Sequence, residues 1–198
     1  MTTSVAPSNL IGGRLALDFA NELGPSPDFS WQDLLRFLLS TRIISSERSS
    51  QLLALPQNDP QSASQLLSRA RLLHASLSKI FASMVRKENL ARDWAEPINA
   101  VLRITEGHDE LLHREGSWRL EFVAREGGLD WLLAAIARSA AELVAEGPGP
   151  NLRACSNPDC GLFFYDTSRT HGRRWCSMSR CGNRHKVAAF TRRHAAGR

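Results

Sequence analysis

Apolar residues in the first 150 positions recur mainly at the three- and four-residue intervals of an α-helix. Leu15, Phe19 and Leu23 lie on one face of a short predicted helix. Ser30 and Asp33 resemble a capping box, which opens a second helix with a broad leucine face. The chain therefore begins as helices that each present one apolar face to a core.

A long helix follows. Asp59 is a suitable N-cap and Pro60 fits the first helical position, so the helix can run to about Lys87. Its apolar stripe consists of Leu66, Ala70, Leu73, Leu77, Ile80 and Met84. We interpret this stripe as facing a core, and the alternative is the seam of a coiled-coil dimer.

Two shorter helices flank the long one. The first is expected over residues 46–55, where Pro56 stops it. The second is expected over residues 92–104, with Pro97 tolerated only near its first turn.

The pattern changes over residues 110–124, where apolar and polar residues alternate around a turn at 114–117 and predict a β-hairpin. A last helix is expected from Leu129 to Leu143. The Gly-Pro-Gly-Pro stretch at 147–150 reads as a linker. The sequence thus predicts a mainly α N-terminal domain over residues 1–146 that contains one small hairpin.

Charge divides the chain at the same linker. The 198 residues carry a formal net charge of +5, yet residues 1–150 hold 15 basic and 18 acidic side chains, whereas residues 151–198 hold 10 and 2. A hydrophobic share of 42% is enough for a buried core. The chain has no apolar run of membrane-spanning length and no signal-peptide pattern at its start, so we expect a cytoplasmic protein without a membrane partner.

All four cysteines lie in this basic C-terminal module (residues 151–198). They form two pairs with four residues inside each pair and 15 between the pairs. They are Cys155, Cys160, Cys176 and Cys181. Each pair can direct two sulfurs to one point, and four thiolates complete a closed tetrahedral shell, so we predict one structural Zn²⁺. The alternatives are disulfides or a redox role, and replacement of one cysteine ligand by His171 or His185.

The rest of the module is consistent with a small treble-clef-like zinc finger. Residues 162–165 have strand character, and residues 173–176 are expected to form the returning strand. A helix can open after Cys181, with Val187 and Phe190 facing inward. The predicted fold is therefore a mainly α domain followed by a small α+β module.

These motifs also resemble a known family. Residues 155–168, 174–178 and 181–186, which include the tetrapeptide Cys-Gly-Asn-Arg, resemble the bacterial CGNR zinc finger. Residues 12–21 resemble the start of the ABATE domain that precedes this finger, although Glu22 stands where that domain has threonine. The resemblance implies a bacterial transcription regulator, described as stress-induced.

The basic side chains of the module predict DNA as a partner, because arginine suits bidentate contacts to phosphate and to guanine. The candidate contacts are Arg173, Arg174, Arg184, Lys186, Arg192 and Arg193. The alternative is a solvated basic surface, or arginines that support the zinc-bound sulfurs.

The N-terminal domain lacks the glycine-rich, nucleophile-elbow and zinc-protease motifs of common enzyme classes. Asp18 and Asn21, three residues apart on the first helix, are candidates for lining a ligand pocket, while local hydrogen bonding is the interpretation we favour. The predicted function is DNA-binding transcription regulation, with a helical domain that senses a small-molecule effector or forms a homodimer. The alternative is a ligand-binding protein or enzyme in which the zinc module is a structural cap or a protein-interaction element.

Overall fold

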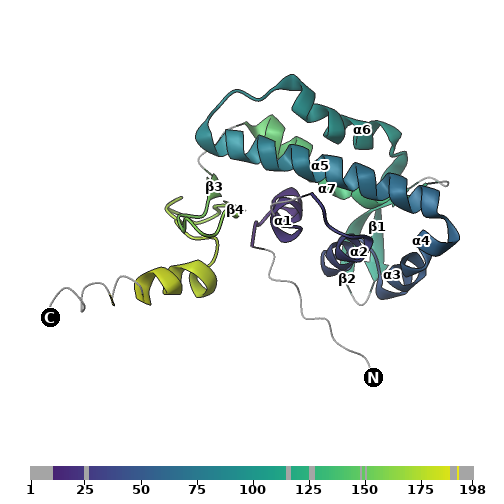
Figure 1. The fold of residues 1–198 in the computed structure, drawn as a ribbon, viewed down its shortest axis with the longest axis horizontal. Coiled ribbons are helices and arrows are strands. Elements are labelled where there is room, and N and C mark those ends of the chain that lie inside the picture. Colours follow the sequence, from purple (N-terminus) through teal and green to yellow (C-terminus); the bar gives the residue numbers. More distant parts are fainter. Residues whose placement is uncertain are drawn as a thin grey trace.

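The computed structural model describes residues 11–24, 27–114, 117–124, 128–147, 149, 151–187 and 191. Figure 1 shows a helical body (residues 11–147) with the C-terminal module attached at one end, beside α1. The helices of the body are α1 (Leu15–Glu22), α2 (Trp31–Ser40), α3 (Ser46–Leu53), α4 (Leu55–Asn58), α5 (Pro60–Arg86), η1 (Arg92–Ala95), α6 (Glu96–Ile104) and α7 (Trp131–Glu146). No helix in the described part of the chain is long and apolar enough to cross a membrane.

Helix α5 is the centre of the body and packs against α1, α2, α6 and α7. The Asp59 side chain caps its start by accepting a hydrogen bond from the Ser62 N–H at 3.0 Å. Lys87 ends it in the left-handed conformation, with φ of 58°. All six residues of the predicted stripe are buried in the core. The core interpretation is therefore confirmed, and a coiled-coil seam on this stripe is wrong.

The remaining body elements follow the predictions with one correction. The capping box of α2 is present, with Ser30 and Asp33 each accepting a hydrogen bond from the backbone N–H of the other. The predicted stop at Pro56 is wrong in detail, since α3 ends at Leu53 and Pro56 lies in the first turn of α4. A first-turn proline lacks only a donor that would have no helical partner anyway. Pro97 occupies the first turn of α6, as expected.

The predicted hairpin is confirmed and begins earlier than expected. Strands β1 (Gly107–Arg114) and β2 (Ser117–Ala124) pair antiparallel, with Leu111 opposite Leu120. The tip of the predicted turn, at 115–116, lies outside the described residues.

The C-terminal module contains a second small sheet whose pairing differs from the prediction. Strand β4 (Phe163–Tyr165) pairs antiparallel with β3 (Leu152–Ala154), which precedes the first cysteine pair. A returning strand at 173–176 is therefore wrong. Its backbone bonds elsewhere, because the N–H of Arg173 binds the buried carboxylate of Asp166.

A π-helical turn, η2 (Met178–Gly182), follows Cys176 and contains Cys181. It leads into α-helical residues 183–187. Val187 was expected to face inward but is exposed, because the small interior of the module is filled by Phe164 and the cysteines. Phe190 lies outside the described residues. The fold class, a mainly α domain with a hairpin plus a small zinc module, is confirmed.

Candidate metal centre and its attachment to the helical body

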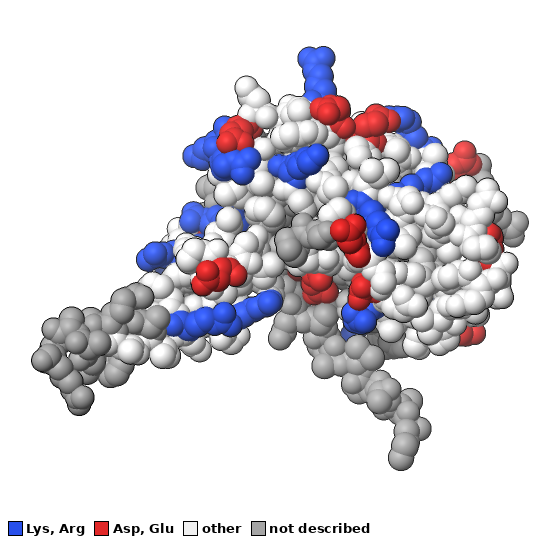
Figure 2. All heavy atoms as spheres, viewed as in Figure 1, with Lys and Arg blue, Asp and Glu red and all other residues white. Residues whose placement is uncertain are grey.

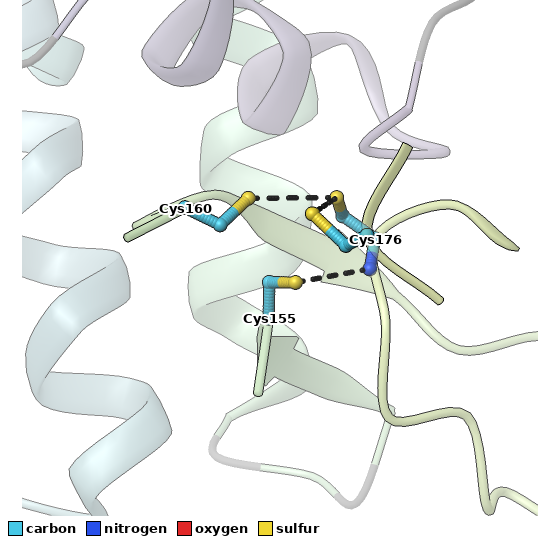
Figure 3. A group of neighbouring side chains, drawn as sticks. Cys155, Cys160 and Cys176 are labelled. Carbon is cyan, nitrogen blue, oxygen red and sulfur yellow. Dashed lines mark hydrogen bonds between the residues drawn. The ribbon is translucent and has the colours of Figure 1, made fainter. Parts of the chain in front are cut away.

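The four cysteines come together as the sequence predicts. Their Sγ atoms all lie within 4.8 Å of one another. Figure 3 shows the side chains of Cys155, Cys160 and Cys176 converging from separate segments. The Sγ atom of Cys176 lies 3.6 Å from that of Cys160 and 3.7 Å from that of Cys181. All four residues are free cysteines, so the disulfide alternative is not realised in this structure.

This geometry fits a zinc ion. A tetrahedron with Zn–S bonds of about 2.3 Å has edges of about 3.8 Å, close to the sulfur separations found here. Burial and the neighbouring sulfurs raise the pKa of the Cys176 thiol far above its ordinary value. A divalent cation at the centre would reverse that effect and hold all four groups as thiolates. The cluster is therefore able to hold one Zn²⁺, with four protein ligands and no position left for a reacting water.

Backbone and amide donors orient two of the sulfurs. The N–H of Cys176 points to the Sγ atom of Cys155 at 3.4 Å, and the side-chain amide of Asn157 points to that of Cys181 at 3.5 Å. Such donors favour the thiolate form and fix the rotamer of the ligand. They make the cluster a built site rather than a chance gathering of thiols.

A buried carboxylate shapes the loop between the two cysteine pairs. Asp166 accepts hydrogen bonds from the N–H groups of Ser168 and Arg173, at 3.0 and 2.9 Å. Burial alone would raise the pKa of this carboxyl, but these hydrogen bonds outweigh it and lower the pKa. Asp166 thus holds residues 166–173 in the turn that returns the chain to Cys176.

The free edge of β4 is covered by the helical body. The side-chain amide of Asn21, on α1, donates to the carbonyl of Phe163 at 2.8 Å and accepts from its N–H at 2.9 Å. The N–H of Tyr165 donates to the carbonyl of Gly12 at 2.7 Å. Asn21 therefore acts as a short substitute for a neighbouring strand, and it satisfies edge groups that would otherwise be unpaired.

Side chains reinforce this attachment. Leu152 is buried in the main core, and Phe163 packs against Phe81 of α5 with ring centres 6.2 Å apart. The guanidinium of Arg14 lies 4.5 Å from the ring centre of Tyr165, whose hydroxyl donates to Glu146 at 2.9 Å. The module is thus joined to the body by packing and hydrogen bonds as well as by the chain at 147–150.

Comparison with protein families agrees with this architecture. One family model, the ABATE domain, described as "Putative stress-induced transcription regulator", matches residues 13–147. The chain belongs to this family. A second model, the CGNR zinc finger, matches residues 151–194. These ranges are called the ABATE domain and the CGNR finger below. No curated protein matches the chain.

The structure assigns Arg173 of the CGNR finger an internal role. Its guanidinium donates to the carbonyls of Trp175 and Cys176, and it lies 4.6 Å from the ring centre of Phe164. Because Cys176 belongs to the four-cysteine cluster, these bonds hold the backbone next to that cluster. The alternative in which arginines support the zinc site therefore describes Arg173 better than a DNA contact does.

The other predicted DNA contacts differ in position. Arg174, Arg184 and Lys186 are exposed, and the guanidinium of Arg174 lies 5.4 Å from the ring centre of Trp175. Arg192 and Arg193 lie outside the described residues. Figure 2 shows Lys and Arg side chains spread over the described part of the finger.

The two predicted ligand-binding residues of the ABATE domain have different surroundings. Asp18 is buried, and its carboxylate accepts a hydrogen bond from the N–H of Gly12 at 2.6 Å. This is the local anchoring that we favoured from the sequence. Asn21 uses both amide atoms on the finger, a contact that sequence reasoning missed because nothing in the pattern near α1 indicates a partner more than 140 residues away.

Proposed function

We propose that the protein is a DNA-binding transcription regulator in which the zinc-ordered CGNR finger contacts the DNA backbone. The observation that carries this proposal is the exposure of basic side chains beside the zinc cluster, in a module with 10 basic and 2 acidic residues. Arginine and lysine side chains on such a surface bind phosphates and release condensed counterions. Membership of a family described as a transcription regulator supports the same reading.

The proposed set of DNA contacts differs from the one expected from the sequence, because the guanidinium of Arg173 is engaged inside the finger. Arg174 and Arg184, with Lys186, present exposed cations, and Arg180 of η2 adds a further one. Ser177 caps this segment by accepting from the Arg180 N–H at 3.3 Å, so the helix starts directly beside the metal cluster. Zinc thereby fixes the direction of the helix that carries these side chains. Arg192 and Arg193 remain predicted contacts from the sequence.

The test is fluorescence anisotropy with a labelled random-sequence duplex and the zinc-loaded full chain. We expect Arg184→Ala and Lys186→Ala each to weaken binding and to lower the salt slope by about one. Lys79→Ala, at an exposed lysine of α5, is the matched control and should bind as the parent does. If the zinc-loaded chain ignores DNA at low salt, the finger is instead a structural cap or a protein-interaction element.

A small-molecule effector and a homodimer belong to this proposal as further parts of the regulator. The ABATE domain is the part of the chain expected to provide both. Sedimentation of the zinc-loaded chain at several concentrations tests the dimer, and a single monomer mass throughout would remove it from the proposal.

A further inference from the structure

The hairpin of β1 and β2, labelled in Figure 1, stands apart from the hydrophobic core, because no described residue of either strand belongs to that core. The sheet consists of these two strands, and neither makes an extensive contact with a described helix. A two-stranded hairpin alone is at best marginally stable in water and needs further strands or a packed face. Within the described part of the chain, the hairpin therefore lacks the partner that such an element requires.

One face of the hairpin carries large exposed apolar side chains. Leu111 is 61% exposed and Trp118 is 67% exposed. Leu111 and His113 are two residues apart on β1 and so share a face. Trp118 is opposite His113 on that face, with the two ring centres 5.0 Å apart. Exposed apolar side chains that gather on one face in this way indicate an interaction surface.

The outer edge of β2 is open to pairing. Among the described residues β2 pairs with β1 alone, so the backbone groups that point away from β1 have no strand partner there. Proteins commonly protect such an edge with proline, lysine or a bulge. The eight residues of β2 include no proline and no lysine, and their register with β1 is continuous. The edge of β2 is therefore able to accept a further strand.

The sequence of β2 is complementary to itself. Two copies can pair antiparallel about a two-fold axis at Leu120, and Arg119 then lies opposite the second copy's Glu121. In the same register Trp118 lies opposite the second copy's Phe122. Each pairing occurs twice because the contact is isologous, and opposite charges and aromatic residues at opposed positions stabilise a strand pair. Moving the axis by one residue would place Arg119 opposite Arg119, or Glu121 opposite Glu121, so the charges select this register.

The register inside the hairpin gives a second reason for a cation at this edge. Glu121 lies opposite Glu110 of β1, and like charges directly opposite each other destabilise a strand pair. A second copy would bring its Arg119 to the other side of Glu121. The edge of β1 lacks this complementarity, since an axis at Leu111 would place Glu110 opposite Leu112. Self-pairing is therefore favoured at β2.

We propose that the ABATE domain forms a two-fold symmetric homodimer in which β2 pairs antiparallel with β2 of a second copy, giving one four-stranded sheet. The inference rests on the proposed function in one respect, because it names the interface of the homodimer included there. The added strand lies next to Trp118 and covers part of its exposed ring. The dimer carries two CGNR fingers related by the same axis, which is the arrangement that matches DNA with inverted half-sites.

Sedimentation of the zinc-loaded full chain over a concentration series measures the dimer. Arg119→Glu and Glu121→Arg each place like charges opposite one another at two positions, so each should weaken dimerisation at least about tenfold. The double variant, Arg119→Glu with Glu121→Arg, restores opposite charges and should dimerise as the parent does. Lys79→Glu, a matched charge reversal at an exposed position of α5, should leave dimerisation unchanged.

The double variant separates a lost interface from a misfolded hairpin, because combining two folding defects would not repair them. Dimerisation that resists both single reversals, or a double variant that stays monomeric, would overturn the proposed interface. Binding of DNA is measured separately by anisotropy. A parent chain that binds DNA but is monomeric at every concentration overturns this inference and leaves DNA binding intact. A chain that dimerises through β2 but ignores DNA overturns the proposed DNA-binding function alone.

Discussion

Replacing Asn21 by alanine removes the only side chain of α1 that bonds to the backbone of β4 in the described residues. The two hydrogen bonds at 2.8 and 2.9 Å are lost together, and the N–H and carbonyl of Phe163 lose their partners at a partly buried edge. Each such bond contributes about 1 kcal/mol net, so we expect the zinc-loaded protein to lose about 2 kcal/mol of unfolding free energy.

The same substitution should weaken zinc binding. In the zinc-free chain the finger is expected to be unfolded, and the Asn21 contact is then absent whether or not the side chain is present. The loss therefore falls only on the zinc-loaded state. By linkage, a loss of about 2 kcal/mol corresponds to zinc affinity about 30-fold lower.

Urea denaturation with and without a chelator measures the first effect, and competition with a chromogenic chelator measures the second. Asn58→Ala, at an exposed asparagine at the end of α4, is the matched control and should change neither quantity. If Asn21→Ala destabilises zinc-loaded and zinc-free protein equally, or leaves zinc affinity unchanged, the inferred coupling between the ABATE domain and the finger is refuted.

Three further predictions follow from single sites. The pKa of folded Asp18 is about 6, above the ordinary 3.8 of an unfolded aspartate, so its contribution to stability is full below pH 3.8 and is lost as the pH rises through 6. Asp18→Asn should therefore stabilise the protein at pH 7.5 by roughly 2 kcal/mol after allowance for solvent screening, and urea titrations at several pH values that show no gain would contradict this. Cys176→Ser should abolish stoichiometric zinc in metal analysis and expose the finger to protease, whereas retention of one zinc per chain would exclude it as a ligand. Ser30→Ala should cost about 1 kcal/mol in thermal unfolding because the α2 cap is lost, and an unchanged midpoint would show that Asp33 alone suffices.

Local patterns predicted the elements of this chain well because their causes are local. The stripe from Leu66 to Met84 and the caps at Ser30 and Asp59 depend only on neighbouring residues. The spacing of the cysteines within each pair is typical of metal ligands, so this signal is also local. Each of these signals is contained in a few turns of chain.

The errors arise where distant segments decide the structure. The sequence predicts that β4 pairs with a strand that follows it, at 173–176. In the structure its partner is β3, which precedes the first cysteine pair. For Asn21 the sequence favours local hydrogen bonding, with a ligand pocket as the other possibility, but both of its amide atoms bond to the backbone of Phe163, far along the chain. Arg173 was counted among the DNA contacts because its charge is visible in the sequence, while the carbonyls that engage it are not. Pairing partners and hydrogen-bond acceptors of this kind become apparent only in the folded chain.

The central claim, that zinc orders a finger which binds DNA through its cations, is tested most directly by one titration series. The affinity of the full chain for a labelled duplex is measured from low to physiological salt, with zinc and with a chelator. The account predicts that affinity in the zinc-loaded state falls linearly on a log–log plot, with a slope set by the number of phosphates contacted, and that the chelated chain binds far more weakly. Salt-independent binding, or equal affinity with and without zinc, would contradict it.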